Sequence, residues 1–255
     1  MTVAHGAELE QEVDTCVHRV APEVKVLATV LFVVAVALVP HGRWWPFAAD
    51  AVLLSAVAVL ARVPAGFLAR RLVVEIPFVL FVVVLPFATR GPEVDVLGVG
   101  LAREGLVAAG AIAAKATLAV LATGVLAATT PAPAILSGLE RLHAPRQLTA
   151  IAAFAVRYLQ VVLDELRRLR LARIARGDDP RWLWQARAVG QSAGALAVRC
   201  FERGERVHGA MLARGFDGSL PVGALSVPAR PAAWGLGLPV PLLAATATVL
   251  ARAAG

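Results

Sequence analysis

Five long apolar segments joined by polar connections constrain the fold of this chain more than any other feature. Each approaches the roughly 17–25 residues that a helix needs to cross a bilayer. Hydrophobic residues make up 58% of the 255 residues and charged residues only 17%, whereas soluble domains have about 25% charged residues. We therefore expect an all-α integral membrane protein with spans at 26–39, 44–61, 72–88, 105–128 and 232–251.

The spacing of these segments predicts three parts. Residues 1–128 should form a transmembrane bundle with the first four spans, residues 129–231 a polar helical segment, and residues 232–255 a last transmembrane helix. Pro77 falls in the first turn of its span, where proline is tolerated. The prolines of the last span require neighbouring helices to accommodate a kink.

Arginine placement predicts the orientation, because short loops rich in Arg and Lys stay in the cytoplasm. The short loop from Arg62 to Arg71 has three arginines and no acid, whereas the loop from Arg90 to Glu104 mixes both signs. The segment 131–231 holds fifteen arginines against eight acidic residues, which equals the net charge of +7 of the whole chain. We expect this segment and the N-terminus to be cytoplasmic.

Two long helices are predicted within the polar segment, after a short helix at 132–142. Apolar residues recur at intervals of three and four from Leu148 to Leu169, as on one face of a helix of about thirty residues. Asp178-Asp179-Pro180 should end it, and a second helix with a stripe of small residues should begin near Arg181. Small residues let two helices cross closely.

Residues 148–163 could instead be a sixth span, since this stretch is apolar apart from a few residues. Arg157 lies near its centre, and a central arginine costs about 2.5–3.5 kcal/mol on insertion scales. A cytoplasmic or interfacial helix avoids that cost. Arg157 is therefore a candidate for a role in the polar segment.

The two long helices end in the same way. The first ends in Ala175-Arg176-Gly177 and the second in Ala213-Arg214-Gly215. An arginine in the last turn with a glycine beyond it is an ordinary helix ending, so either motif alone has little meaning. As a matched pair they present two guanidinium groups, each suited to a carboxylate on another protein.

Catalytic and cofactor motifs do not emerge from the sequence. The two lysines, Lys25 and Lys115, follow no glycine-rich phosphate loop, and the histidines lack metal-ligand spacing. We expect a non-enzymatic chain that binds no cofactor or metal. Lys115 stands out because it lies midway along a predicted span, where a charged residue suggests a function, or a side chain that extends toward the interface.

Several motifs together resemble the transmembrane T component of energy-coupling-factor (ECF) transporters, and most closely its cobalt/nickel, CbiQ-like branch. The resemblance covers nearly the whole chain. Its motifs are, in order, His18-Arg19 with Pro22 and Lys25, Thr129-Thr130-Pro131, Leu139-Glu140-Arg141-Leu142 with Pro145-Arg146, Arg157-Tyr158, Asp164–Arg168, and the two Ala-Arg-Gly endings, the second within 202–218.

The resemblance implies a coupling scaffold in a prokaryotic plasma membrane. Its expected partners are two cytoplasmic ABC ATPase subunits, which carry ATP and Mg, a substrate-binding membrane subunit for cobalt or nickel, and in some assemblies a further small membrane subunit. Arg176 and Arg214 would dock into the ATPases, and the two crossing helices would transmit ATPase closure to the substrate-binding subunit.

Two other interpretations remain open at this point. The same scaffold could serve a vitamin such as biotin or thiamine. The basic segment could instead anchor anionic lipid or nucleic acid. Its acids stand beside its arginines, as at 164–168 and 202–206, which is typical of an internally paired helix surface. We therefore expect the lipid bilayer but no nucleic acid among its partners.

Overall fold

The computed structural model describes residues 15, 17–40, 42–88, 93–96, 99–177, 186–218 and 231–253. The chain divides into two compact units. Unit 1 comprises Met1–Leu142 and Ser226–Gly255, and unit 2 comprises His143–Leu225. The predicted break at Asp178-Asp179-Pro180 and the start of the second helix near Arg181 lie outside the described residues.

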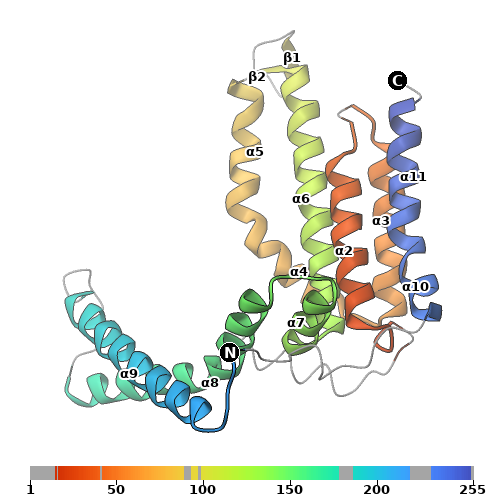
Figure 1. Ribbon diagram of the computed structural model, residues 1–255. Coiled ribbons are helices and arrows are strands. Elements are labelled where there is room, and N and C mark those ends of the chain that lie inside the picture. Colours follow the sequence, from red (N-terminus) through yellow and green to blue (C-terminus); the bar gives the residue numbers. More distant parts are fainter. Residues whose placement is uncertain are drawn as a thin grey trace. The chain divides into compact units, whose positions relative to one another are not determined.

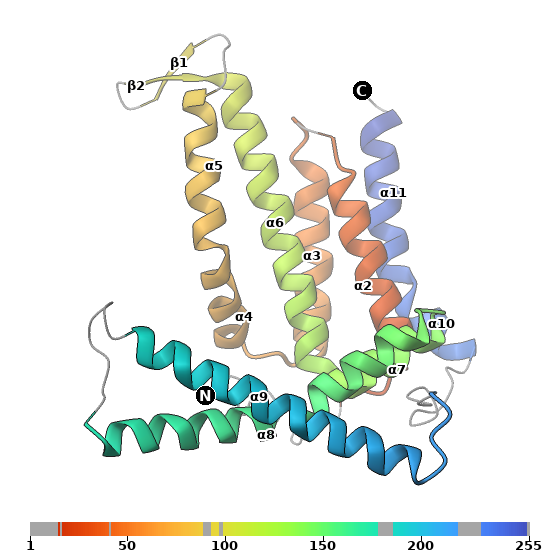
Figure 2. The same ribbon diagram turned by 60° about the vertical axis from the view of Figure 1, so that its left-hand side comes forward.

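Unit 1 is a helical bundle. Figure 1 shows α2, α3, α6 and α11 running side by side, and Figure 2 shows the same arrangement from another direction. In chain order its elements are α2 (Pro22–Ala37), α3 (Trp45–Leu60), α4 (Ala65–Leu72), the 3-10 turn η1 (Val73–Glu75), α5 (Ile76–Ala88), β1 (Glu93–Val96), β2 (Val99–Ala102), α6 (Arg103–Thr129), α7 (Ala132–Arg141), α10 (Pro231–Gly237) and α11 (Pro239–Ala253).

The core of unit 1 lies where α2, α3, α6 and α11 meet. Phe32 and Val36 from α2, Phe47 from α3 and Leu118 from α6 are buried there together with Ala244 from α11. Many apolar side chains on the outer faces of the same helices are exposed, including Val52, Val59, Val249 and Leu250. A bundle that is apolar both inside and outside is typical of a membrane protein.

The predicted spans correspond to apolar helices, with different ends. Two helical stretches are long and apolar enough by themselves to cross a membrane, Arg103–Thr129 and Ala233–Ala253, and Trp45–Leu60 is apolar but shorter. The predicted span 72–88 is interrupted, because η1 separates α4 from α5. Pro77 lies in the first turn of α5, as predicted, since its missing N–H has no helical partner there in any case.

The described part of the chain departs from a wholly helical fold in one place. Strands β1 and β2 form an antiparallel hairpin in which Glu93 pairs with Ala102 and Val96 with Val99. Val94 and Val96 alternate with acidic residues in β1, and Val99 and Leu101 alternate with small residues in β2, a pattern that suits a strand. The hairpin joins α5 to α6, which explains why these two helices lie antiparallel.

The predicted short helix is present as α7, and it packs against α2 within unit 1. A Cβ atom added at Gly138 would lie 2.9 Å from the backbone nitrogen of Glu23. The glycine therefore allows the two backbones to approach closely. The Arg141 Nε atom lies 3.5 Å from the Glu23 carboxylate, which is a second link between α7 and α2.

Candidate partner-binding site

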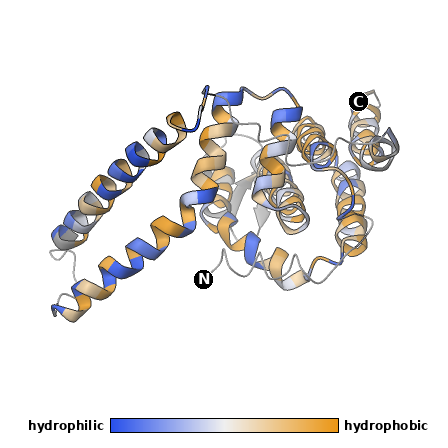
Figure 3. Cartoon of the chain, turned by 60° about the horizontal axis from the view of Figure 1, so that its bottom comes forward, coloured by the Kyte–Doolittle hydropathy of each residue, from blue (hydrophilic) through white to orange (hydrophobic). Residues whose placement is uncertain are grey.

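Unit 2 consists of two long amphipathic helices that pack on each other. Helix α8 spans Arg146–Ala175, close to the predicted thirty residues, and α9 spans Ala186–Leu212. Polar and apolar residues alternate along both helices in Figure 3. Of the described helices, α8 is not among those long and apolar enough by themselves to cross a membrane. A sixth span at 148–163 stays a prediction.

An ion pair joins the two helices of unit 2. Arg199 on α9 donates to the Glu165 carboxylate on α8, and the Arg168 guanidinium on α8 lies 4.0 Å from the same carboxylate. The Glu165 side chain is only 18% exposed. A carboxylate shared between helices in this way favours one crossing geometry over others.

Two other acids in unit 2 pair with a nearby arginine on the same helix, as the sequence predicted. Arg167 donates to Asp164 over 3.1 Å, and Arg206 lies 3.9 Å from Glu202. Both pairs are three or four residues apart on exposed helix surfaces. Arg157 is exposed on α8, and no partner for its guanidinium occurs among the described residues. Its predicted role remains a prediction.

The end of α8 is shaped by a glycine in the left-handed conformation. Gly177 has φ = 78°, and its N–H donates to the Ile174 carbonyl over 3.0 Å. Arg176 is the C-cap residue, with an exposed side chain, and Ala175 is the last helical residue before it. A residue with a β-carbon is disfavoured in the left-handed conformation, which accounts for the glycine.

The end of α9 repeats this arrangement. Gly215 has φ = 82°, and its N–H donates to the Leu212 carbonyl over 3.0 Å. Phe216 N–H closes the turn by donating to the Met211 carbonyl, which completes a Schellman motif. Arg214 and Ala213 therefore occupy the same positions relative to their glycine as Arg176 and Ala175 do. Each arginine side chain is exposed.

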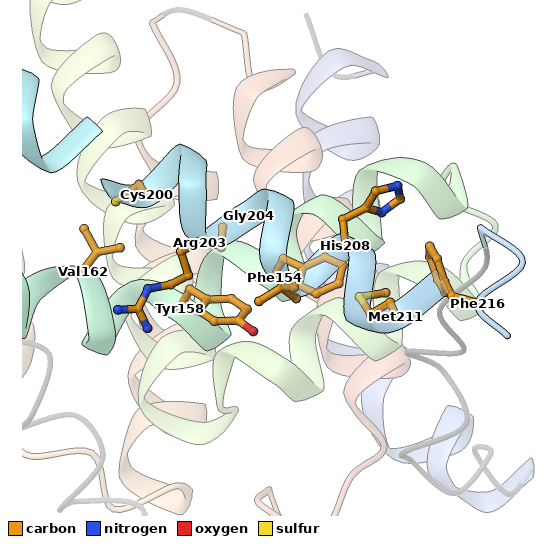
Figure 4. Close-up of a pocket in the computed structure, with 11 residues that line it drawn as sticks. Phe154, Tyr158, Val162, Cys200, Arg203, Gly204, His208, Met211 and Phe216 are labelled. Atoms are coloured by element: carbon orange, nitrogen blue, oxygen red, sulfur yellow. The ribbon is translucent and has the colours of Figure 1, made fainter. Parts of the chain in front are cut away.

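A groove of about 360 Å³ runs between α8 and α9. Figure 4 shows Phe154, Tyr158 and Val162 on the α8 side, facing residues of α9. The small-residue stripe was predicted to let the helices cross closely, but an added Cβ at Gly204, beside the groove, would meet nothing within 4 Å. The α9 side is formed by Cys200, Arg203, Gly204, Val207, His208 and Met211, with Phe216 at the end.

Large apolar side chains also remain exposed on both helices of unit 2. They are Leu148, Ile151, Leu159, Val161, Leu166, Leu171 and Ile174 on α8, and Val189, Val198, Phe201 and Leu212 on α9. Apolar side chains exposed in this number on two helices are typical of a surface that contacts another protein or a membrane. The predicted docking arginines lie at the ends of these same helices.

Lys115 lies in α6 but reaches the end of another helix. Its ammonium donates to the Ala37 carbonyl over 2.9 Å, at the last residue of α2. Arg252 from α11 donates to the neighbouring Leu38 carbonyl over 2.8 Å. Both cations satisfy carbonyls that a helix leaves without intrahelical partners at its C-terminus. The sequence indicated only that the Lys115 ammonium needed a partner or had to extend toward the membrane–water interface.

Several polar contacts in unit 1 escaped sequence reasoning. Glu75 is buried and accepts a hydrogen bond of 2.9 Å from Thr117 in α6. Asp50 is 1% exposed, and its Oδ2 atom has no hydrogen-bond partner within the described part of the chain. Among the described residues, no three His, Cys, Asp or Glu side chains form a group that could hold a metal ion.

The fold and the site define a class of protein: a helical membrane protein with a separate pair of amphipathic helices that end in matched arginine-glycine turns. Comparison with known proteins agrees with this class. Residues 14–222 match the family model CbiQ, described as cobalt transport protein. The chain therefore belongs to the CbiQ cobalt transport protein family.

Individual relatives are similar over most of their length. The cobalt transport protein CbiQ of Rhodobacter capsulatus is 31% identical over 69% of this chain and 70% of its own. The energy-coupling factor transporter transmembrane protein EcfT of Bacillus selenitireducens is 31% identical over 80% of this chain and 81% of its own. EcfT of Acidaminococcus fermentans is 25% identical over 76% of this chain and 84% of its own. All three are named as transport proteins.

Proposed function

We propose that this chain is the energy-coupling transmembrane scaffold of an ECF-type importer, most closely of the cobalt or nickel type. The support comes from membership of the CbiQ family and from the fold, which combines an apolar helical bundle with a separate helical pair. The chain itself would be non-catalytic and would bind no cofactor, with ATP and Mg held by partner ATPases.

The matched helix ends carry the docking part of this proposal. Arg176 and Arg214 occupy equivalent positions at two helix ends of the same hydrogen-bonded geometry. Two equivalent ends suit two similar partners, which is what a pair of cytoplasmic ATPase subunits provides. A guanidinium on a rigid turn can form a bidentate pair with a carboxylate in a groove of the partner.

The exposed apolar surface of α8 and α9 supports a second proposed contact, with a membrane subunit. We propose that it meets the substrate-binding membrane subunit, and in some assemblies a further small membrane subunit. Motion of the ATPases would change the α8–α9 crossing, and this surface would pass the change to the substrate-binding subunit. The groove along Phe154 and Tyr158 gives this surface a concave part.

The proposed topology has five membrane crossings with a cytoplasmic N-terminus in a prokaryotic plasma membrane. It follows from the placement of arginines, and it requires that α2, α3 and the α4–α5 pair cross together with α6 and α11. In this topology Lys115 and Arg252 lie at the outer end of unit 1, opposite the N-terminus of α2.

The decisive test replaces the docking arginines in the assembled transporter. Arg176→Glu and Arg214→Glu should each reduce co-purification of the ATPase subunits and labelled cobalt or nickel uptake, and the double variant should abolish both. Arg170→Glu, at an exposed position on α8, is the matched control and should retain both. If the double variant assembles and transports normally, the coupling proposal is wrong.

A vitamin importer is the second candidate, and the similarity to EcfT proteins over most of the chain favours keeping it. Cells that express the full assembly would be given labelled cobalt, nickel, biotin or thiamine. Metal uptake supports the proposed substrate. Vitamin uptake without metal uptake would move the chain to the vitamin branch and leave its scaffold role intact.

A further inference from the structure

An apolar cavity of about 680 Å³ lies in unit 1 between α2, α3 and α6. This volume falls within the roughly 300–1,000 Å³ of small-molecule sites. The deep part is lined by buried side chains, namely Phe32, Leu54, Ala122 and Val125. The lining also includes Val59, which is 75% exposed, and Leu60, which is 66% exposed. The cavity therefore opens toward the side of the bundle.

The cavity is elongated, with its polar groups toward one end. Along α2 its lining runs from Lys25 to Phe32, and along α3 from Arg62 back to Leu54. The helical part of each path, from Lys25 to Phe32 in α2 and from Leu60 back to Leu54 in α3, corresponds to roughly 10 Å at about 1.5 Å per residue. The deep end is apolar, and the end near the N-terminus of α2 carries the charged residues. Such a shape suits an amphiphile with one polar end.

Both charged residues of the lining are cations. Lys25 and Arg62 lie at the polar end, and none of the described residues that line the cavity is acidic. The Lys25 ammonium donates to the Thr129 carbonyl over 2.8 Å, which holds it at this end. The Arg62 side chain is exposed. The cavity is therefore complementary to an apolar chain with an anionic head.

Arg62 occupies a backbone position that normally favours glycine. It follows the C-cap of α3 with φ = 52°, and its N–H donates to the Val59 carbonyl over 2.9 Å. The next N–H, from Val63, donates to the Ala58 carbonyl over 3.0 Å, which completes a Schellman motif. Glycine is usual at this place because a β-carbon is disfavoured there. A strained residue points to a use for its side chain.

We propose that this cavity binds an anionic phospholipid, with one acyl chain in the apolar part and the phosphate between Arg62 and Lys25. A lipid fits better than free phosphate because most of the lining is apolar and the opening is flanked by exposed Val59 and Leu60. In the proposed topology the site faces the cytoplasmic leaflet, which is rich in anionic lipid and attracts basic residues.

The test uses the full-length chain, purified in detergent and titrated with phosphatidylglycerol or phosphatidylcholine of the same chain length. Native mass spectrometry would count the bound lipids. Wild type should retain phosphatidylglycerol preferentially. Arg62→Gly should weaken that binding about fivefold, in line with the contribution of one basic residue at a membrane surface, and leave phosphatidylcholine binding unchanged. Glycine suits φ at this position, so the fold should be retained.

Two further variants test whether binding depends on the cavity itself. Arg70→Gln removes an exposed cation on α4 that does not line the cavity, and it should bind phosphatidylglycerol like wild type. Ala28→Leu should fill part of the cavity and reduce retention of both lipids. Each variant would be checked by its melting temperature.

Three results would overturn the proposal. Arg62→Gly could bind phosphatidylglycerol as wild type does, which would remove the headgroup site. The two lipids could bind equally in every variant, as expected of non-specific lipid around the bundle. Inorganic phosphate could displace the lipid completely while Ala28→Leu has no effect, which would indicate a site for a free anion.

Discussion

Lys25 and Lys115, the two lysines of the chain, each donate a hydrogen bond to a carbonyl at the C-terminal end of the other's helix. Lys25 in α2 reaches the carbonyl of Thr129, the last residue of α6, over 2.8 Å. Lys115 in α6 reaches the carbonyl of Ala37, the last residue of α2, over 2.9 Å. The antiparallel pair is thus capped reciprocally, with a cation at each negative helix end.

Replacing Lys115 with methionine should destabilise the bundle rather than block a transport step. The variant keeps most of the apolar stem but loses a charge-assisted hydrogen bond, which should lower the free energy of unfolding by about 1–2 kcal/mol. For a chain of this size, thermal unfolding in detergent should shift downward by roughly 2–4 °C per kcal/mol. Lys115→Arg should recover most of the loss.

Lys25→Met provides the partner measurement. The two caps lie at opposite ends of the α2–α6 pair, so the two losses should add within about 0.5 kcal/mol in the double variant. Transport per folded molecule should stay near wild type in Lys115→Met. Loss of transport with an unchanged melting temperature would mean that Lys115 has a direct role in transport and not a structural one.

Gly138→Ala should be strongly destabilising, although it adds only one methyl group. The added Cβ would lie 2.9 Å from the Glu23 backbone nitrogen and 3.0 Å from the Pro22 carbonyl carbon, neither of which can rotate away. Overpacking of this kind costs about 1–3 kcal/mol. Gly66→Ala, in α4 of the same unit, is the control, because an added Cβ there meets nothing within 4 Å.

The control should behave in the opposite way. Alanine has a higher helix propensity than glycine, so Gly66→Ala should stabilise by about 0.5–1 kcal/mol. Melting curves of the two variants, recorded side by side, would show opposite shifts. Equal shifts would mean that α7 does not approach α2 as closely as the structure indicates.

Local patterns predicted the long helices of unit 2 better than the ends of the membrane spans. The period of apolar residues predicted α8 to within a few residues, and the Arg-Gly endings predicted helix ends at Gly177 and Gly215, where φ is positive. These features depend on neighbours within one or two turns. The alternation of apolar residues at 93–102 is local too, but a single short hairpin gives a weak signal among long apolar segments.

Contacts between distant residues could not be predicted in this way. The partner of Lys115 lies 78 residues earlier, and it depends on where α2 ends relative to α6. The hydrogen bond between Thr117 and Glu75 depends on the break between α4 and α5. Charge and burial indicated that these residues needed partners, and only the packing of the helices determined which ones.

The Glu165–Arg199 pair should have a small but measurable effect on the α8–α9 crossing. Arg199 is 56% exposed, so solvent screens the interaction and a double-mutant cycle should give a coupling energy of about 0.2–1 kcal/mol. The cycle would compare Glu165→Gln, Arg199→Gln and the double variant by hydrogen exchange of α9 amides. The coupling energy should fall as salt rises, and an Asp164→Gln variant should show no coupling to Arg199.

The last prediction separates helix-end geometry from charge in the proposed docking. Gly177→Ala and Gly215→Ala keep both arginines but place a β-carbon where φ is 78° and 82°, which is disfavoured by about 1 kcal/mol and should reshape each turn.

In the assembled transporter each glycine variant should reduce co-purification of the ATPase subunits by several-fold. Gly190→Ala, where an added Cβ in α9 meets nothing within 4 Å, should leave co-purification unchanged. If the glycine variants retain the ATPases while Arg176→Glu and Arg214→Glu lose them, docking depends on the guanidinium charge alone. If all four retain the ATPases, the helix ends are not the docking site.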